Sequence, residues 1–151
     1  MEEALPKQKL KVVKKKLQWE NPIDGYQYIF TFPNDILGDA QLIYCQLKDW
    51  RYEHSGRDFY KALKVQGLHD GDTIAHLNEF YPNGRGLSEK TSEKMRLGRG
   101  LKALNFLIQE AIKKEAVVLY CFSGKDSMQS FLAKHHFTKF NEWRYYKILS
   151  D

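Results

Sequence analysis

The sequence predicts an α/β fold, and three runs of residues carry this prediction. Tyr26 to Phe32 (YQYIFTF) is rich in aromatic and β-branched residues and reads as a strand. Leu101 to Lys114 repeats apolar residues at helical spacing, which indicates an amphipathic helix. Ala116 to Phe122 (AVVLYCF) is almost wholly apolar, as expected of a strand buried on both faces. Strands and helices alternate through the second half, which is typical of α/β proteins.

The size and composition fit one domain. The chain has 151 residues, and 42% are hydrophobic, enough for a core without disulfides or metals. We expect a single domain over residues 1–151, with residues 1–8 as a flexible terminus. No apolar stretch reaches the roughly 18–20 residues that span a bilayer, and Met1 to Lys16 lacks the apolar run of a secretory signal. We therefore expect a soluble cytoplasmic protein without membrane association.

The first half is less clearly patterned than the second. Lys9 to Trp19 fits either a strand or a short helix. The strand that ends at Phe32 is followed by breaks at Pro33–Asp35 and Gly38–Asp39, and Gln41 to Leu47 reads as the next strand. Between Asp49 and Asp72, the spacing of Phe59 and Leu63 favours a short helix over a strand.

The second half contains a strand at Thr73–Tyr81 and then a long polar loop from Pro82 to Gly100. After the helix and the apolar strand already described, the pattern predicts a helix at Asp126–His135 and short strands at Phe137–Phe140 and Trp143–Leu149.

The loop before the main helix has the chemistry of a phosphate site. Gly98-Arg99-Gly100 opens the helix, where free backbone N–H groups and the helix dipole attract anions. Glycine leaves room for the backbone to approach a phosphate. Arg96 or Arg99 could add charge-assisted hydrogen bonds.

From about Thr73 to Leu149 the chain resembles the GNAT superfamily of N-acyltransferases. The family's loop reads Arg/Gln-x-x-Gly-x-Gly/Ala, and Gly98 and Gly100 match its glycines, while Met95 takes the Arg/Gln position. Upstream, Phe80 to Gly86 (FYPNGRG) keeps the Pro and Arg-Gly of the family's Val-x-Pro-x-x-Arg-Gly. Leu87 to Leu97 then separates the two matches, so we interpret residues 83–97 as an inserted loop.

A third match lies in the next helix, where the family reads Asn-x-x-Ala-x-x-Phe-Tyr-x-x-x-Gly-Phe. Phe131 and Phe137 fall at the right spacing. Lys125, Met128, Leu132 and His136 replace the Asn, Ala, Tyr and Gly. In many members that Tyr protonates the leaving thiolate, which Leu132 cannot do.

The resemblance implies a mixed, mostly antiparallel sheet, splayed to admit the pantetheine arm and flanked by helices. It also implies acetyl-CoA, or another acyl-CoA, as co-substrate, with no metal, and direct attack by a primary amine of a small molecule or protein. The residues that it places at the coenzyme are Phe80, Tyr81, Arg85, Gly86, Arg96, Gly98, Arg99, Gly100, Lys125 and Phe131.

Acyl transfer needs a base for the amine and a donor for the thioester carbonyl. Glu79, on the predicted strand, is the preferred base, and His76 is the alternative. Strand alternation predicts that His76, Asn78 and Phe80 share one face, and Leu77, Glu79 and Tyr81 the other. A backbone N–H near Phe80 or Tyr81 would polarise the carbonyl.

The sequence leaves open which group protonates the leaving thiolate. Tyr120, Tyr145 and Tyr146 are candidates, although aromatic packing explains them more simply, and water could protonate the thiolate. His135 and His136 point about 100° apart on a helix and cannot share a metal ion. Cys45 and Cys121 lack a CxxC partner and are interpreted as buried structural thiols.

The positive charge leaves other functions open. The net charge is +5, and six lysines cluster between Lys7 and Lys16. This cluster is either a solvated arm or a phosphate-binding one. Besides an N-acyltransferase, the sequence therefore allows a CoA-binding module with altered catalysis, or an acetyltransferase directed at tRNA or another nucleic acid. The acceptor is open, as is the oligomeric state, for which a homodimer is one option.

Overall fold

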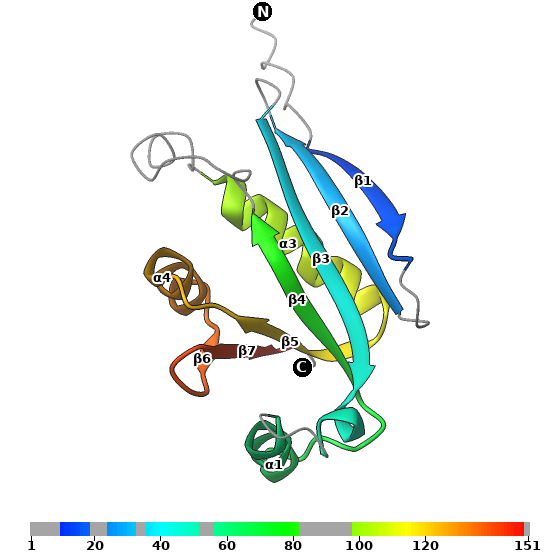
Figure 1. Cartoon of the computed structure of the whole chain (residues 1–151), viewed down its shortest axis with the longest axis vertical. Coiled ribbons are helices and arrows are strands. Elements are labelled where there is room, and N and C mark those ends of the chain that lie inside the picture. The colour runs from blue at the N-terminus through cyan, green and yellow to red at the C-terminus, as the bar shows by residue number, and fades with distance from the viewer. Residues whose placement is uncertain (1–9, 19–23, 33–35, 52–55, 82–97, 150–151) are drawn as a thin grey trace, which may run out of the picture.

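The computed structural model describes residues 10–18, 24–32, 36–51, 56–81 and 98–149. In this part of the chain the strands form one seven-stranded sheet with the order β1-β2-β3-β4-β5-β7-β6 (Figure 1). The pair β4–β5 is parallel and the other pairs are antiparallel. The strands are β1 (Lys11–Lys16), β2 (Asp24–Phe32), β3 (Ile36–Gln46), β4 (Thr73–Tyr81), β5 (Ala116–Phe122), β6 (Thr138–Lys139) and β7 (Arg144–Ile148).

In the described part of the chain, four helical segments flank this sheet. They are the 3₁₀ helix η2 (Leu47–Trp50) and the α-helices α1 (Arg57–Val65), α3 (Arg99–Lys113) and α4 (Asp126–Lys134). The predicted α/β class and the mixed, mostly antiparallel sheet flanked by helices are confirmed. No helix in the described part of the chain is long and apolar enough to cross a membrane.

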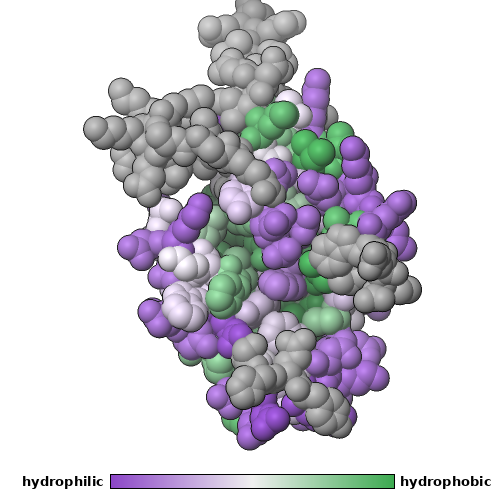
Figure 2. All heavy atoms as spheres, viewed as in Figure 1, coloured by the Kyte–Doolittle hydropathy of each residue, from purple (hydrophilic) through white to green (hydrophobic). Residues whose placement is uncertain are grey.

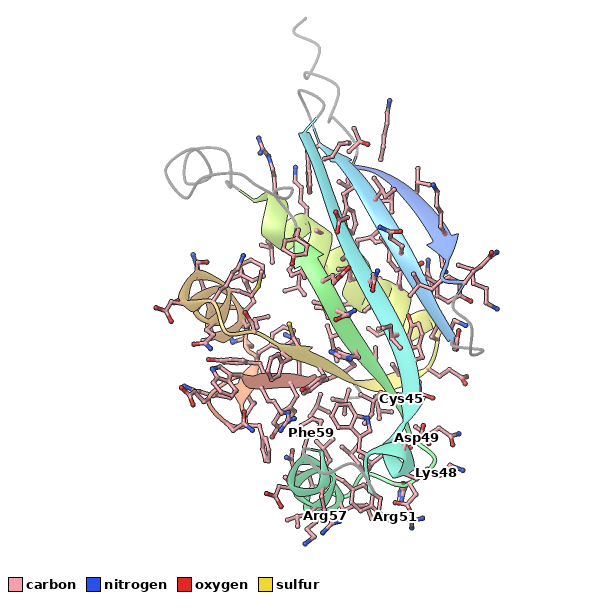
Figure 3. All side chains as sticks on the ribbon, viewed as in Figure 1. Cys45, Lys48, Asp49, Arg51, Arg57 and Phe59 are labelled. Carbon is pink, nitrogen blue, oxygen red and sulfur yellow. The ribbon has the colours of Figure 1, made fainter. Side chains whose placement is uncertain are left out.

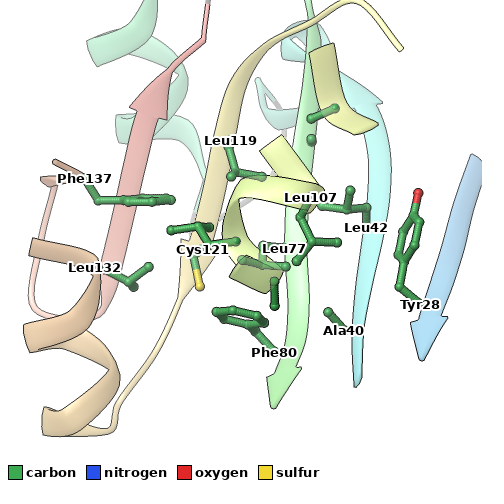
Figure 4. Close-up of a cluster of buried hydrophobic side chains, with 14 of the residues drawn as sticks. Tyr28, Ala40, Leu42, Leu77, Phe80, Leu107, Leu119, Cys121, Leu132 and Phe137 are labelled. Atoms are coloured by element: carbon green, nitrogen blue, oxygen red, sulfur yellow. The ribbon is translucent and has the colours of Figure 1, made fainter. Parts of the chain in front are cut away.

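The helix α3 covers one face of the sheet. Its residues Ala103, Leu104, Leu107 and Ala111 are buried against inward side chains of β2 to β5. Leu132 from α4 and Phe137 close the same cluster (Figure 4). The helical spacing of the α3 residues therefore does what the sequence predicts: it buries one stripe of the helix.

The opposite face is covered at one end by η2 and α1. Phe59 is fully buried and lies between the rings of Trp50, Tyr120, Phe140 and Tyr146, with centroid separations of 5.1–5.6 Å. Figure 3 shows Phe59 pointing from α1 toward the sheet, with Arg57 on the outer side. The predicted short helix around Phe59 and Leu63 is confirmed.

In the first half of the chain, the structure decides between the two alternatives left open at one segment and corrects the prediction at another. Lys11 to Lys16, which fitted a strand or a helix, forms the edge strand β1. The break expected at Gly38–Asp39 is wrong, because β3 runs through both residues and pairs with β2 from Ile36 onward. Gly38 is buried and lies opposite Phe30, so the pairing continues through a residue type that weakens strands.

Candidate functional site

The parallel pair β4–β5 opens partway along its length. Cα partners run from Thr73 and Ala116 to Leu77 and Cys121. Beyond Leu77, β4 pairs only with β3, while β5 pairs only with β7. The two strands diverge from that point (Figure 1). The predicted splay of the sheet is therefore present, and the backbone of β4 after Leu77 lies outside the β4–β5 ladder.

A β-bulge lies in the part of β4 beyond its pairing with β5. Gln41 is the partner of Asn78 and Asp39 is the partner of Tyr81, so two residues of β4 oppose one of β3. The first of the two, Glu79, has φ = 49°. A non-glycine residue in this left-handed region costs about 1–2 kcal/mol, and such strain tends to persist at functional sites.

Glu79 stands apart from the other described residues with positive φ. Glu115 and His136 directly follow the C-caps of α3 and α4, where left-handed residues are common. Glu79 instead lies inside a strand. Its strain therefore has no helix-capping explanation and belongs to the bulge.

The bulge also corrects the predicted faces of β4. Simple alternation placed Phe80 with His76 and Asn78, but Phe80 is buried in the same cluster as Leu77, beneath α3 (Figure 4). The extra residue at the bulge changes the phase of the strand. The side chain of Glu79 is thereby left exposed.

The helix α3 starts beside this opening. Gly98 is its N-cap and has φ = 78°, a conformation that glycine adopts without steric cost. At Gly100 an added Cβ would come within 2.9 Å of a ring carbon of Phe131. The need for glycine at position 100 is therefore explained by the packing of α4 on α3, and not by phosphate approach alone.

Arg99 carries an unsatisfied polar group at the same place. Its Nη1 is buried without a hydrogen-bond partner, one of two such side-chain atoms in the described part of the chain. The guanidinium carbon lies 5.9 Å from the centroid of the Phe32 ring. A buried donor without a partner costs about 1–3 kcal/mol. A phosphate at the start of α3 would accept a hydrogen bond from this donor. It would also interact favourably with the positive end of the helix dipole.

Three aromatic residues and a lysine line the mouth of the opening. The ring of Phe131 lies 6.1 Å from that of Phe80, so α4 contacts both the end of β4 and the start of α3. Lys125, the N-cap of α4, places its Nζ 5.8 Å from the ring centroid of Tyr81. The structure thus brings together the described members of the predicted coenzyme site. Arg85, Gly86 and Arg96 lie outside the described residues.

The two predicted bases differ in their surroundings. The His76 ring packs 4.8 Å from that of Tyr120, on the face opposite α3. Burial lowers the pKa of His76 to about 4, so this imidazole is neutral at pH 7 and a weak proton acceptor. Glu79 lies at the bulge, beyond the end of the β4–β5 pairing. Of the two predicted bases, Glu79 has the exposed side chain.

The candidate acids are largely occupied by structural contacts. Leu132 is fully buried in the core, so no phenol lies at that position of α4. The Tyr146 hydroxyl accepts a hydrogen bond from Gln66 Nε2 at 2.7 Å, and Tyr145 is buried on the α3 side. Tyr120 accepts a hydrogen bond from Arg144 Nε at 3.0 Å.

Arg144 was not singled out by the sequence argument. It begins β7 opposite Phe122, the last residue of β5, and so lies beside the opening. The only sequence signal for it was an arginine at the start of an otherwise aromatic strand, which is too common to be informative.

Among the described residues, no group of three His, Cys, Asp or Glu side chains could hold a metal ion. Cys121 is buried, and burial raises the pKa of its thiol to about 12, as expected of a structural cysteine. Cys45 is only partly buried, and its sulfur accepts the indole N–H of Trp50 at 3.0 Å.

Comparison with known proteins gives one similar structure. It is a crystal structure of a provisionally assigned acetyltransferase from Staphylococcus aureus Mu50, with 17% identity and a TM-score of 0.46. The match covers 82% of this chain and 72% of the other. No protein-family model and no curated protein matches the chain.

The low pKa of His76 predicts a pH-dependent stability. An unfolded histidine protonates near pH 6.5, whereas native His76 stays neutral to about pH 4. The unfolded chain then binds more protons between these values, so stability falls as the pH drops from 6.5 toward 4. Urea midpoints at pH 7 and pH 5 should differ less in His76→Phe than in the wild type.

The exposed His69 provides the control for this measurement. His69→Phe makes the same change at an exposed position and should keep the pH dependence of the wild type. An unchanged pH dependence in His76→Phe would contradict the buried, neutral state of His76.

Proposed function

We propose that this chain is an acyl-CoA-dependent N-acyltransferase that transfers an acetyl group from acetyl-CoA to a primary amine. The observation that carries the proposal is the strained bulge at Glu79 in the part of β4 that has left its parallel partner, next to the glycine-capped start of α3. An extended pantetheine arm can pair with a free strand edge, and its phosphates suit a helix N-terminus.

The charged end of the coenzyme finds matching groups at α3. The backbone N–H groups after Gly98 point along the helix axis, and the buried Nη1 of Arg99 is without a partner among the described residues. Lys125, across the opening, is exposed and adds a second positive charge. These features support a phosphate-bearing ligand at this end.

The reaction follows from the groups at the bulge. Glu79 accepts a proton from the ammonium of the acceptor, directly or through water. The amine nitrogen then forms a bond to the thioester carbon, and a backbone N–H near Phe80 or Tyr81 stabilises the oxyanion. The nitrogen of the adduct loses its second proton to solvent and the C–S bond breaks. The coenzyme thiolate takes a proton from solvent, because Leu132 offers none.

A second candidate is a CoA-binding module without this catalysis. The full burial of Leu132 in the core favours it, because α4 then supplies no phenolic acid. A nucleic-acid-directed acetyltransferase has less support. The lysines of β1 lie on the far edge of the sheet from β5, and lysines on an edge strand also prevent edge-to-edge association.

Acetyl-CoA binding tests the coenzyme site. Acetyl-CoA should bind in calorimetry, and Gly98→Asp should abolish binding, because the new carboxylate repels phosphate where the helix dipole attracts it. Gly67→Asp is the matched control, since Gly67 also has positive φ (92°) and open space around it. Failure of both acetyl-CoA and free CoA to bind at millimolar concentration would sink the proposal.

A measurement of turnover distinguishes an N-acyltransferase from a CoA-binding module without catalysis. Glu79→Gln should lower kcat on an amine panel by about 10²–10⁴, the range of general base catalysis, with acetyl-CoA affinity preserved. Glu115→Gln makes the same change at another exposed glutamate with positive φ (62°) and should leave kcat unchanged. Acetyl-CoA binding without turnover of any amine would favour the binding module.

A further inference from the structure

An open hollow of about 560 Å³ lies at the end of β5, lined by Phe122 and by Asn141, Glu142, Trp143 and Arg144 from the β6–β7 turn and the start of β7. Phe122 follows Cys121, the last partner of β4, so the hollow borders the β4–β5 opening. Side chains alternate along β5, which places Phe122 on the same face as Tyr120, opposite α3. On this face, hydrophobic atoms show between hydrophilic ones (Figure 2).

The walls of the hollow are two exposed aromatic rings. Phe122 is 52% exposed and Trp143 is 46% exposed. Their ring centroids lie 6.1 Å apart with an interplanar angle of 57°. Both rings therefore expose apolar surface to water. A flat or branched apolar group that packs against both rings would bury this surface.

The hollow also carries one charge of each sign. Arg144 uses its Nε to bind Tyr120, but its guanidinium has no carboxylate partner in the described part of the chain. Glu142 is exposed and likewise forms no ion pair there. The guanidinium carbon of Arg144 lies 6.0 Å from the centroid of the Phe122 ring. The guanidinium favours a carboxylate, and the Glu142 carboxylate favours an ammonium. A zwitterion therefore matches the hollow better than a simple anion does.

Hydrogen bonds hold this arrangement in place. Asn141 Oδ1 accepts from the backbone N–H groups of Trp143 and Arg144 at 3.1 and 3.0 Å. Gln129 Nε2, from α4, donates to the carbonyl oxygens of Ser123 and Glu142 at 2.8 and 3.0 Å. The turn and the end of β5 are thus fixed to each other, which reduces the ordering cost of binding.

We propose that this hollow binds the acceptor, and that the acceptor is an amino carboxylate with an apolar side chain. Its carboxylate pairs with Arg144, and its side chain packs against Phe122 and Trp143. Glu142 attracts the ammonium to the hollow, and transfer requires the amine to reach the coenzyme and Glu79 across the opening. This inference rests on the proposed acyltransferase function for the chemistry, but the binding itself requires no turnover.

The test uses L-phenylalanine as the probe, titrated by calorimetry into the full chain with and without CoA. L-Phenylalaninamide keeps the ring and the amine but lacks the carboxylate, and should bind about tenfold more weakly, as for the loss of a charge-assisted contact. 3-Phenylpropanoate lacks the amine and should also bind more weakly than L-phenylalanine.

Variants then test whether Arg144 causes the difference in affinity between L-phenylalanine and its amide. In Arg144→Gln, L-phenylalanine and its amide should bind equally weakly, whereas Arg144→Lys should keep part of the difference. Arg57→Gln removes the same type of side chain from the outer side of α1 and should leave the difference intact (Figure 3). The ligand comparison on the wild type needs no folded variant.

The outcomes are distinct from those of the acyltransferase test. If CoA binds and amines are acetylated, but L-phenylalanine and its amide bind equally or not at all, the acceptor inference is overturned and the enzyme stands. If CoA does not bind, but L-phenylalanine binds with Arg144-dependent discrimination, the hollow is a site and the acyltransferase proposal fails.

Discussion

The parallel pairing of β4 with β5 stops after Leu77 and Cys121, and the remaining features of the site depend on that termination. A parallel pair in the middle of a sheet is ordinarily hydrogen-bonded along its length. Here the two strands separate, β4 continuing with β3 and β5 with β7. Within the described part of the chain, β4 beyond Leu77 is thus no longer paired with β5, although both strands lie in the interior of the sheet.

Each feature near the opening can be understood from this geometry. The bulge at Glu79 bends β4 where it leaves β5 and turns an acidic side chain outward. Gly100 lets Phe131 pack on the first turn of α3, which draws α4 toward the same place. On the opposite face of the sheet, the buried aromatic cluster around Phe59 packs against β4, β5 and β7. The sheet is thus covered by α3 on one face, and by η2 and α1 at one end of the other face.

Sequence periodicity predicted the elements near the site well and its details less well. Thr73–Tyr81 and Ala116–Phe122 were placed with their observed bounds, because their apolar runs are sharply ended. The bulge was missed because the residue types around it do not mark it. Glu79 stands in a backbone conformation that glycine usually takes. The faces of β4 were consequently wrong at Phe80. Arg144 was missed because its position beside Phe122 depends on strand pairing between distant segments.

Backbone amide NMR of the ¹⁵N-labelled chain, titrated with acetyl-CoA, tests most directly whether the β4–β5 opening holds the coenzyme. The account predicts the largest shift changes at Glu79 to Tyr81 and at the start of α3, with little change in β1 and β2. Shift changes confined to β1 and β2, or none at millimolar acetyl-CoA, would contradict it.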